Sequence, residues 1–388
     1  MSKAGVYIHI PFCERKCNYC DFLSKPGTRQ LQKEYVQALK KEIADKKELL
    51  SGYMIETVFI GGGTPSFLEP SDIREILRVL WENIASVDNG FCRGGGLADV
   101  KEITMEANPG TLTREKLMIY KEAGINRISM GLQSANNEEL KELGRIHTYE
   151  QFLENYQVAR ECGFDNINID LMSALPGQTV ESYEETLRKV VALKPEHISA
   201  YSLIIEEGTP FYDKYGPKGT ATNRIPSEET DRKMYHLTGK LLKEQGYHRY
   251  EISNYAREGK ECEHNLFYWS GVDYIGFGLG AASLIQNVRY KNTVDMKQYL
   301  LQEDVRKVEY VLDKTMRMEE FMFLGLRKMQ GVRKDTFAEL FGQTVEEVYK
   351  EEIMQLKNLD LLEESKGYLR LTEQGIDVSN TVLAKFLL

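Results

Sequence analysis

Two hydrophobic patterns alternate along the first 200 residues of the chain. Short runs rich in Val, Ile, Tyr and Thr, each ending near Gly, Pro, Asn or Ser, predict β-strands. Longer stretches between them repeat their apolar residues at helical spacing. Six strands therefore alternate with helices, which is typical of a parallel sheet with right-handed crossovers. The predicted strands are Val6–Ile10, Thr57–Ile60, Glu102–Ala107, Arg127–Leu132, Asn166–Leu171 and His197–Leu203, and the predicted helices are Leu31–Leu50, Asp72–Ile84, Arg114–Glu122, Tyr149–Cys162 and Glu181–Leu193.

Residues that could bind a metal or a ligand lie at the carboxyl ends of these strands. In α/β barrels that rim carries the active site. The six strand–helix units are fewer than the eight of a closed TIM barrel. We therefore predict an α/β fold, a partial (open) TIM-type (β/α)6 barrel whose lateral mouth admits a large substrate. The rim positions are Cys13 after the first strand, Gly61–Thr64 after the second, Glu106 on the third, Gln133 after the fourth and Asp170 on the fifth.

The chain changes character from about Asp313 onward. Helical patterns are followed by a predicted hairpin over 361–371 that turns at Lys366 and Gly367. This order predicts a small winged-helix-like helical domain over 313–388, after a core with its extension over 1–300. We expect long connections at 204–226 and at Asp88–Asp99. The predicted C-terminal helices are Met316–Met329, Lys334–Phe341 and Val345–Leu359.

Composition and charge limit the classes of function that this chain could have. The 388 residues are 42% hydrophobic and 28% charged, which is typical of a globular chain and excludes a mostly disordered one. The net charge of −9, with an acidic excess over 313–388 as well, argues against a nucleic-acid binder with a basic face. No run of about 18 apolar residues predicts a membrane span. The first residues resemble neither a signal nor a transit peptide, so we expect a cytoplasmic location.

Three of the six cysteines crowd into the spacing Cys13-x3-Cys17-x2-Cys20, whereas Cys92, Cys162 and Cys262 are scattered. Three thiolates on one loop can bind three irons of a [4Fe–4S] cluster and leave the fourth iron open for another ligand. A zinc site with His9 as fourth ligand and a redox-active Cys17/Cys20 pair are alternatives. The loop follows the first strand, and glycine-rich backbone follows the second. This context favours the cluster.

Several motifs in this order resemble the radical S-adenosylmethionine (SAM) superfamily, in the branch that contains oxygen-independent coproporphyrinogen III oxidase and the related heme chaperones. The match extends from Tyr7 to about Ser283. Beyond the cysteine spacing, it rests on the motifs Tyr7–Cys13 (YIHIPFC), Gly61–Pro65 (GGGTP), Glu106–Thr111 (EANPGT), Ser129–Ser134 (SMGLQS), Leu143–His147 (LGRIH), Asn168–Met172 (NIDLM), Leu175–Thr179 (LPGQT) and Tyr250–Tyr255 (YEISNY).

The resemblance implies specific cofactor contacts and no catalytic residue. It implies that Cys13, Cys17 and Cys20 bind a [4Fe–4S] cluster and that SAM occupies the fourth iron. Arg145 would pair with the SAM carboxylate, because its planar fork suits two oxygens. Taken alone, the glycines would fit a tight turn, and each polar residue would fit a structural role. The other implied SAM contacts are Tyr7, Tyr19, Gly62, Gly63, Thr64, Glu106, Gln133 and Asp170.

Three features separate the heme chaperones from the oxidase. Phe22 occupies the position where the oxidase is expected to have a fourth cysteine, and only twelve residues precede Cys13. The run His264-Asn-Leu-Phe-Tyr268-Trp269 resembles the heme motif of the chaperones, and imidazole is a common axial ligand of heme iron. His264 could instead be a hydrogen-bonded loop residue beside core aromatics, and Cys262 is a weaker candidate ligand.

The resemblance therefore favours a heme chaperone that binds the cluster, SAM and heme. It implies transfer of heme to apo-hemoproteins such as respiratory cytochromes, some of them membrane-bound, and an electron donor for the cluster. It also allows a homodimer. We expect no coproporphyrinogen III dehydrogenase activity. The alternative is the oxygen-independent coproporphyrinogen III oxidase itself, and a third is a radical SAM enzyme with another large substrate.

Overall fold

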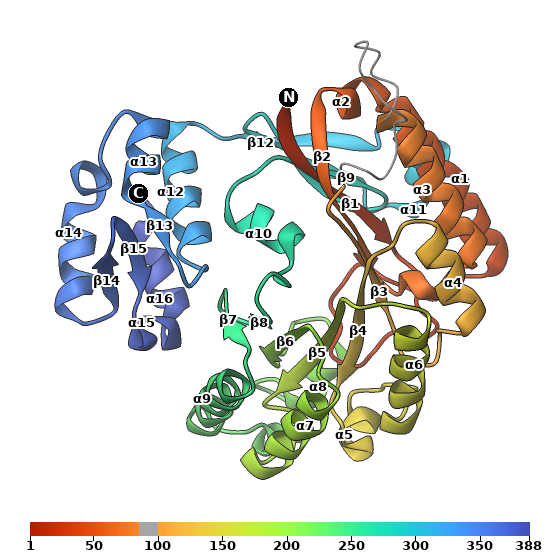
Figure 1. The fold of residues 1–388 in the computed structure, drawn as a ribbon, viewed down its shortest axis with the longest axis horizontal. Helices are drawn as coiled ribbons and strands as arrows, with labels where there is room; N and C mark the ends of the chain where they lie inside the picture. The colour runs from red at the N-terminus through yellow and green to blue at the C-terminus, as the bar shows by residue number, and fades with distance from the viewer. Residues whose placement is uncertain (85–99) are drawn as a thin grey trace.

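The computed structural model describes residues 1–84 and 100–388, and its ribbon is drawn in Figure 1. The predicted loop Asp88–Asp99 and Cys92 lie outside the described residues. Within them the chain forms a 12-stranded sheet and a separate 3-stranded sheet. None of the helices described is both long and apolar enough to cross a lipid bilayer.

Six parallel strands in sequence order form the centre of the large sheet, as predicted. Each predicted strand is present, with ends within four residues of the prediction. The sheet does not close on itself, because its two edge strands are β12 and β7. The open α/β barrel is therefore confirmed. The central strands are β1 (Ser2–Ile10), β2 (Tyr53–Gly62), β3 (Glu102–Ala107), β4 (Arg127–Gln133), β5 (Ile167–Ser173) and β6 (His197–Ser202).

Helices cover the outer face of these strands (Figure 1). One prediction was wrong in detail: the helix expected over Leu31–Leu50 is broken at Lys46 into two helices. Side chains such as Val6, Ile8 and Ile10 point outward and are fully buried in the main apolar core. The helices are α1 (Arg29–Asp45), α2 (Lys47–Ser51), α3 (Pro70–Ile84), α4 (Arg114–Glu122), α5 (Asn137–Glu142), α6 (Tyr149–Glu161), α7 (Val180–Ala192) and α9 (Glu228–Glu244).

The segment after β6 departs from the sequence prediction. The connection expected over 204–226 contains the short helix α8 (Pro210–Tyr215), which Thr209 caps and Pro210 begins. Six further strands then widen the sheet at both edges. β9 pairs in parallel with β1, and the strands beyond it are antiparallel. The added elements are β7 (His248–Arg249), β8 (Asn254–Ala256), α10 (Glu263–Trp269), β9 (Tyr274–Phe277), β10 (Ala282–Ile285), β11 (Val288–Asn292), α11 (Met296–Leu301) and β12 (Arg306–Val311).

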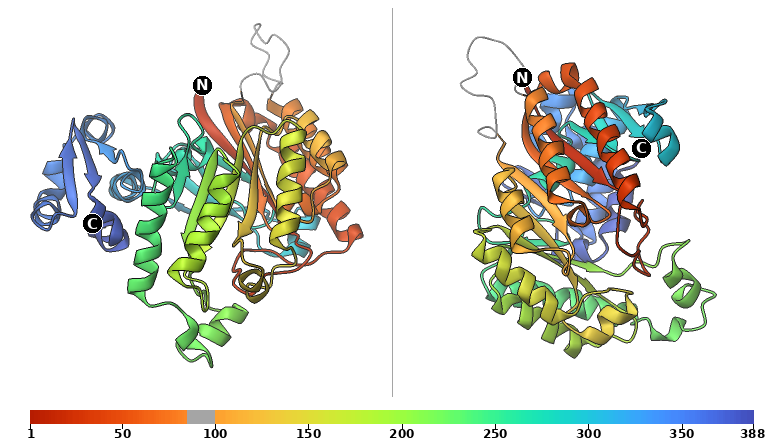
Figure 2. Two further views of the ribbon diagram at one scale, coloured as in Figure 1. Left: turned by 60° about the horizontal axis from the view of Figure 1, so that its bottom comes forward. Right: turned by 90° about the vertical axis from the view of Figure 1, so that its right-hand side faces the viewer.

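The C-terminal residues form a compact unit with an apolar core of their own, on one side of the molecule in Figure 2. Lys366 and Gly367 both have positive φ, so the predicted hairpin turns where expected. Helices followed by this hairpin give the predicted winged-helix-like arrangement. The elements are α12 (Lys314–Gly325), β13 (Val332–Arg333), α13 (Lys334–Phe341), α14 (Val345–Asn358), β14 (Leu362–Ser365), β15 (Tyr368–Leu371), α15 (Glu373–Asp377) and α16 (Ser379–Leu383).

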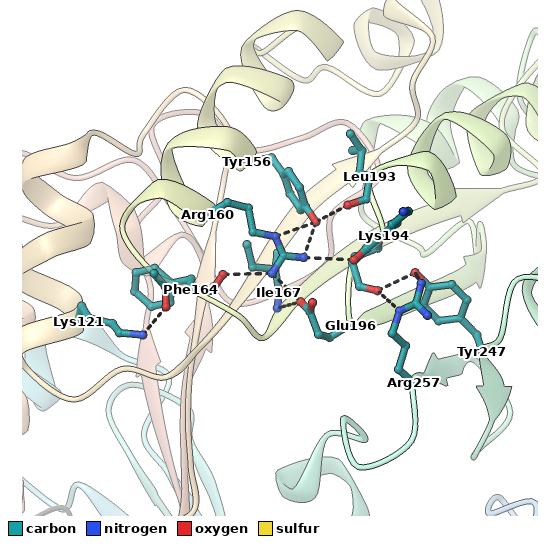
Figure 3. A network of polar contacts seen from close by, with 12 residues as sticks. Lys121, Tyr156, Arg160, Phe164, Ile167, Leu193, Lys194, Glu196, Tyr247 and Arg257 are labelled. Carbon is teal, nitrogen blue, oxygen red and sulfur yellow. Dashed lines mark hydrogen bonds and ion pairs between the residues drawn. The ribbon is translucent and has the colours of Figure 1, made fainter.

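A polar network at the amino ends of β5 and β6 fixes the helices to the sheet (Figure 3). Arg160 of α6 forms an ion pair of 2.8 Å with Glu196, which also accepts a hydrogen bond of 3.0 Å from the backbone N–H of Ile167. The Tyr156 hydroxyl donates to the carbonyl of Leu193 at the end of α7. Glu196 thus connects α6 with two neighbouring strands, at the end of the barrel opposite the cysteine loop.

We expect Glu196→Ala to destabilise the protein by about 1–3 kcal/mol, because Arg160 and the Ile167 N–H lose a partly buried acceptor. Glu196→Gln retains an acceptor for Ile167 and should fall between wild type and alanine. The free energy of unfolding from urea titration measures the effect. The control is Glu229→Ala, which removes an exposed helical ion pair with Lys233 and should cost less than about 0.5 kcal/mol. Equal losses in Glu196→Ala and Glu229→Ala would contradict this assignment.

Candidate functional site

The loop that carries Cys13, Cys17 and Cys20 is held at the carboxyl end of β1 by backbone hydrogen bonds. Cys13 N–H donates to the carbonyl of Lys25, and the N–H of Cys20 donates to the carbonyl of Cys17. Asn18 in the middle of the loop donates from its backbone to the carbonyl of Leu143 at the C-terminal end of α5. The loop is therefore held together by its own backbone and fixed to the far side of the barrel mouth.

The three thiols face a shared cavity with hydrogen-bond donors around them. Thr64 Oγ1 donates to Cys13 Sγ and Arg145 Nη1 donates to Cys17 Sγ, each at 3.5 Å. Burial raises the pKa of the Cys20 thiol. In residues 1–84 and 100–388, no three His, Cys, Asp or Glu side chains converge on one metal ion. A [4Fe–4S] cluster does not require three side chains to converge on one ion, since each thiolate binds a different iron.

His9, the candidate fourth ligand of a zinc site, has both ring nitrogens paired. Nε2 lies 2.8 Å from the carbonyl oxygen of Leu23, and Nδ1 lies 3.0 Å from the Tyr7 hydroxyl. Its ring instead packs against the glycine backbone, since a Cβ at Gly62 would lie 2.4 Å from it. The geometry thus gives His9 a structural role, and the donor set that remains is three cysteines.

The glycines after β2 let the backbone approach the cysteine loop closely. Gly63 N–H donates to the carbonyl of Ile10, and Thr64 N–H donates to that of Phe12, both at 2.8 Å. A Cβ at Gly63 would lie 2.7 Å from the Phe12 carbonyl oxygen, and Gly62 has φ +110°, which disfavours any side chain. Glycine is therefore required here, and the exposed backbone forms one wall of the cavity.

Two half-buried carboxyl groups form the inner wall. Glu106 on β3 accepts a hydrogen bond of 3.0 Å from Gly62 N–H, and Asp170 on β5 accepts from Ser129 and Asn168. Burial raises the pKa of Glu106 to about 7, and the neighbouring Asp170 contributes to the rise. Burial also raises the pKa of Asp170. Two desolvated carboxyls with raised pKa values form a site that a cationic ligand would stabilise.

Arg145 and Gln133 complete the cavity. Arg145 Nη2 donates to the carbonyl of Gly131 at 2.5 Å and to Asn108 Oδ1 at 2.8 Å, which fixes the guanidinium beside Cys17. Gln133 adopts φ +73°, next to a β-bulge in β4. A left-handed glutamine is costly, and such strain concentrates at ligand sites. The bulge turns Gln133 into the cavity lining.

The structure brings eleven of the thirteen predicted site residues into one cavity and places two elsewhere. Sequence reasoning missed Asn108 and Ser129, which also line it, although both belong to recognisable motifs. Tyr7 lies deeper in the barrel, where its ring stacks on Phe59. The eleven are Cys13, Cys17, Tyr19, Cys20, Gly62, Gly63, Thr64, Glu106, Gln133, Arg145 and Asp170.

His264 lies on α10, inside the barrel and away from this cavity. Its Nδ1 is 2.8 Å from Thr57 Oγ1, and its Nε2 is 3.1 Å from the Tyr268 hydroxyl. The ring stacks on Phe59 with 5.3 Å between centroids. Burial, reinforced by Arg127, lowers the pKa of His264 to about 3, so the imidazole is neutral at physiological pH. A neutral imidazole has the lone pair that a heme iron needs.

Similarity to known proteins extends over the whole chain. A family model described as the Radical SAM superfamily matches residues 7–190, and one described as the HemN C-terminal domain matches residues 312–378. The heme chaperone HemW of Bacillus subtilis is 38% identical over 99% of both chains. That of Lactococcus lactis is 37% identical over 99% of this chain and 97% of the relative, and that of Escherichia coli is 34% identical over 99% and 98%.

Among solved structures, coproporphyrinogen III oxidase (HemN) from Escherichia coli, described as a radical SAM enzyme, matches with a TM-score of 0.83. The match covers 100% of this chain and 90% of that one at 24% identity. At this identity the similarity establishes a shared fold.

The raised pKa of Glu106 makes stability depend on pH. Its carboxyl has a pKa of about 7 in the folded chain against 4.5 when exposed, so its contribution to stability is lost as pH rises through this range. The free energy of unfolding of the cofactor-free wild type, relative to Glu106→Gln, should fall by about 3 kcal/mol between about pH 4 and pH 8. Denaturant titrations of both proteins across this range test it. Parallel stability curves would show that Glu106 titrates normally.

Proposed function

This chain belongs to the heme chaperone HemW family of the radical SAM superfamily, and from that premise we propose that it binds heme and transfers it to apo-hemoproteins. The family relationship implies a [4Fe–4S] cluster and SAM as cofactors. The observation that carries the proposal is the cavity in which three cysteines, a glycine strip and polar residues from three strands meet.

We assign the cluster to Cys13, Cys17 and Cys20. Their thiols line the cavity, Thr64 and Arg145 donate hydrogen bonds to two of them, and Asn18 fixes the loop to Leu143. Such donors stabilise the thiolate form that binds iron. When bound, the cluster supplies one-electron chemistry and, at its open iron, an anchor for SAM.

The remaining cavity residues suit SAM. The carboxyls of Glu106 and Asp170 would balance its positive charges, and Arg145 would pair with its carboxylate, because its guanidinium is held in place by Gly131 and Asn108. The backbone of Gly62 and Gly63 gives the ligand close access. Tyr7 lies outside the cavity lining and stacks on Phe59. Its effect on SAM binding would therefore be indirect.

For heme, His264 is the proposed iron ligand, in the motif that resembles the family's heme motif. It is neutral and lies in an aromatic setting with Phe59, Tyr268 and Tyr274. The acceptors would be apo-hemoproteins such as respiratory cytochromes, including membrane-bound ones. An electron donor for the cluster, a cytoplasmic location and a homodimer complete the proposal. Oxidase activity is not favoured, since Phe22, 64% exposed, stands where the oxidase is expected to carry a fourth cysteine.

The cofactor assignment can be tested by separating cluster loss from SAM loss. The triple variant Cys13→Ala, Cys17→Ala, Cys20→Ala should lose iron, sulfide and visible absorbance after anaerobic reconstitution. Arg145→Ala should keep the cluster and bind SAM about 10- to 100-fold more weakly in equilibrium dialysis, since a buried charged hydrogen bond is lost. The control is Arg188→Ala, which removes an exposed helical arginine and should leave both cofactors bound. A triple variant that retains cluster absorbance would refute the ligand assignment.

The chaperone function can be tested by heme binding and transfer. His264→Ala should weaken saturable heme binding by about tenfold or more, whereas His248→Ala, on an exposed histidine, should leave it unchanged. Heme should then pass from the loaded chain to an apo-respiratory cytochrome faster than it dissociates spontaneously into an apomyoglobin trap. Transfer at the dissociation rate would mean that the chain only releases heme. Anaerobic conversion of coproporphyrinogen III would favour the oxidase instead.

A further inference from the structure

His264 is closed off from any large ligand in this structure. The residue is 1% exposed, and both ring nitrogens are occupied by hydroxyl groups of Thr57 and Tyr268. One face of the ring is covered by Phe59, and a Cβ at Gly5 would lie 3.1 Å from the ring. A porphyrin that coordinates through this imidazole has no room between β1, β2 and α10.

The amino end of α10, like the imidazole, is held to the barrel by hydrogen bonds. The Glu102 carboxylate on β3 accepts from the backbone N–H groups of Glu263 and His264, and Cys262 Sγ lies 3.4 Å from it. The N–H of Cys262 donates to the Tyr250 hydroxyl at 3.2 Å. Cys262 itself is 1% exposed. We call the polar partners Thr57, Glu102 and Tyr250 the barrel floor, and exposure of His264 requires the whole amino end of α10 to leave it.

The carboxyl end of α10 lies against the C-terminal unit. Arg327, just after α12, lies over the Trp269 ring at 4.5 Å, and Lys328 Nζ donates to Ser270 Oγ. Tyr268 packs edge-on against Tyr274 of β9, with 4.6 Å between centroids. None of these contacts involves the barrel floor, so they can persist when the amino end of α10 leaves it. The C-terminal unit thus gives α10 a second support about which its amino end can move.

We infer that Thr57 and Tyr268 are positioning residues that hold His264 in a closed, unligated arrangement, and that heme iron reaches the imidazole only after α10 withdraws from the barrel floor. The inference rests on the proposed role of His264 as iron ligand. It follows that heme capture has two steps, opening of α10 and then coordination. The polar groups of the barrel floor set the rate of the first step.

The opening can be measured without heme, because Cys262 is buried by the same segment. Peptide-resolved alkylation of Cys262 by iodoacetamide should be slow in wild type and about tenfold faster in Thr57→Val, which removes the partner of His264 Nδ1 without changing side-chain size. Thr57→Ser keeps the hydroxyl and should behave as wild type. Tyr268→Phe also frees a ring nitrogen of His264, Nε2, but Tyr268 moves with α10, so this variant should label as slowly as wild type. Tyr183→Phe removes a buried hydroxyl pair elsewhere, with Thr238, and controls for general loosening.

Stopped-flow absorbance then tests the coupling to heme. The wild-type rate should reach a plateau as heme concentration rises, because opening becomes limiting, and Thr57→Val should raise that plateau about tenfold. Heme-loaded protein should have Cys262 accessible. Rates linear in heme and equal in wild type and Thr57→Val, with Cys262 still protected, would overturn the inference while leaving the chaperone intact. Heme affinity unchanged in His264→Ala would overturn both the ligand assignment and this inference.

Discussion

The polar inner face of the parallel sheet is the constraint on which the rest of this structure depends. Strands β2 to β6 bring Thr57, Glu102, Arg127, Asn168 and His197 into the barrel, all buried. Buried polar groups are costly unless they are paired. At the amino end of the barrel, α10 and the residues around Tyr250 supply those partners from the same chain. At the carboxyl end the chain leaves Glu106 and Asp170 with raised pKa values, and ligands are expected to complete that layer.

A continuous series of hydrogen bonds joins the two ends. The N–H of Cys262 donates to Tyr250, whose hydroxyl lies 2.8 Å from His197 Nε2. His197 Nδ1 lies 2.6 Å from Asn168 Oδ1, and the Asn168 amide donates to Asp170 at 2.7 Å. Every donor in this series has an acceptor if His197 carries its proton on Nδ1. The segment that encloses His264 is thereby connected through the barrel to the cavity assigned to SAM.

A coproporphyrinogen III oxidase shares this fold, since its solved structure matches the whole chain at a TM-score of 0.83. Function must therefore be argued from the sites. Two local features of this chain bear on the choice between heme chaperone and oxidase. Phe22 is an exposed apolar residue beside the cysteines, and α10 presents a neutral histidine within an aromatic cluster inside the barrel.

Local features were predictable from the amino-acid sequence alone. The Cys13-x3-Cys17-x2-Cys20 spacing, the six strands and the C-terminal hairpin were all readable, because periodicity and turn chemistry act over a few residues. Because the carboxyl ends of parallel strands share one edge, Cys13, Gly62, Gly63, Thr64, Glu106, Gln133 and Asp170 could be expected together. Tyr19 and Arg145 were expected there only from the family resemblance. The short strands β7 to β12 were missed, since each is stabilised by pairing with distant strands.

The positions of His264 and Tyr7 became clear only from the packing of distant segments. Both positions depend on side chains far away in the sequence: Thr57 and Phe59 for His264, and Phe59 again for Tyr7. A motif can identify a histidine as a candidate ligand, but its burial and the partners of its two nitrogens depend on contacts across 207 residues of chain. The pKa of Glu106 has the same origin, because burial and Asp170 raise it only once β3 and β5 share the barrel interior.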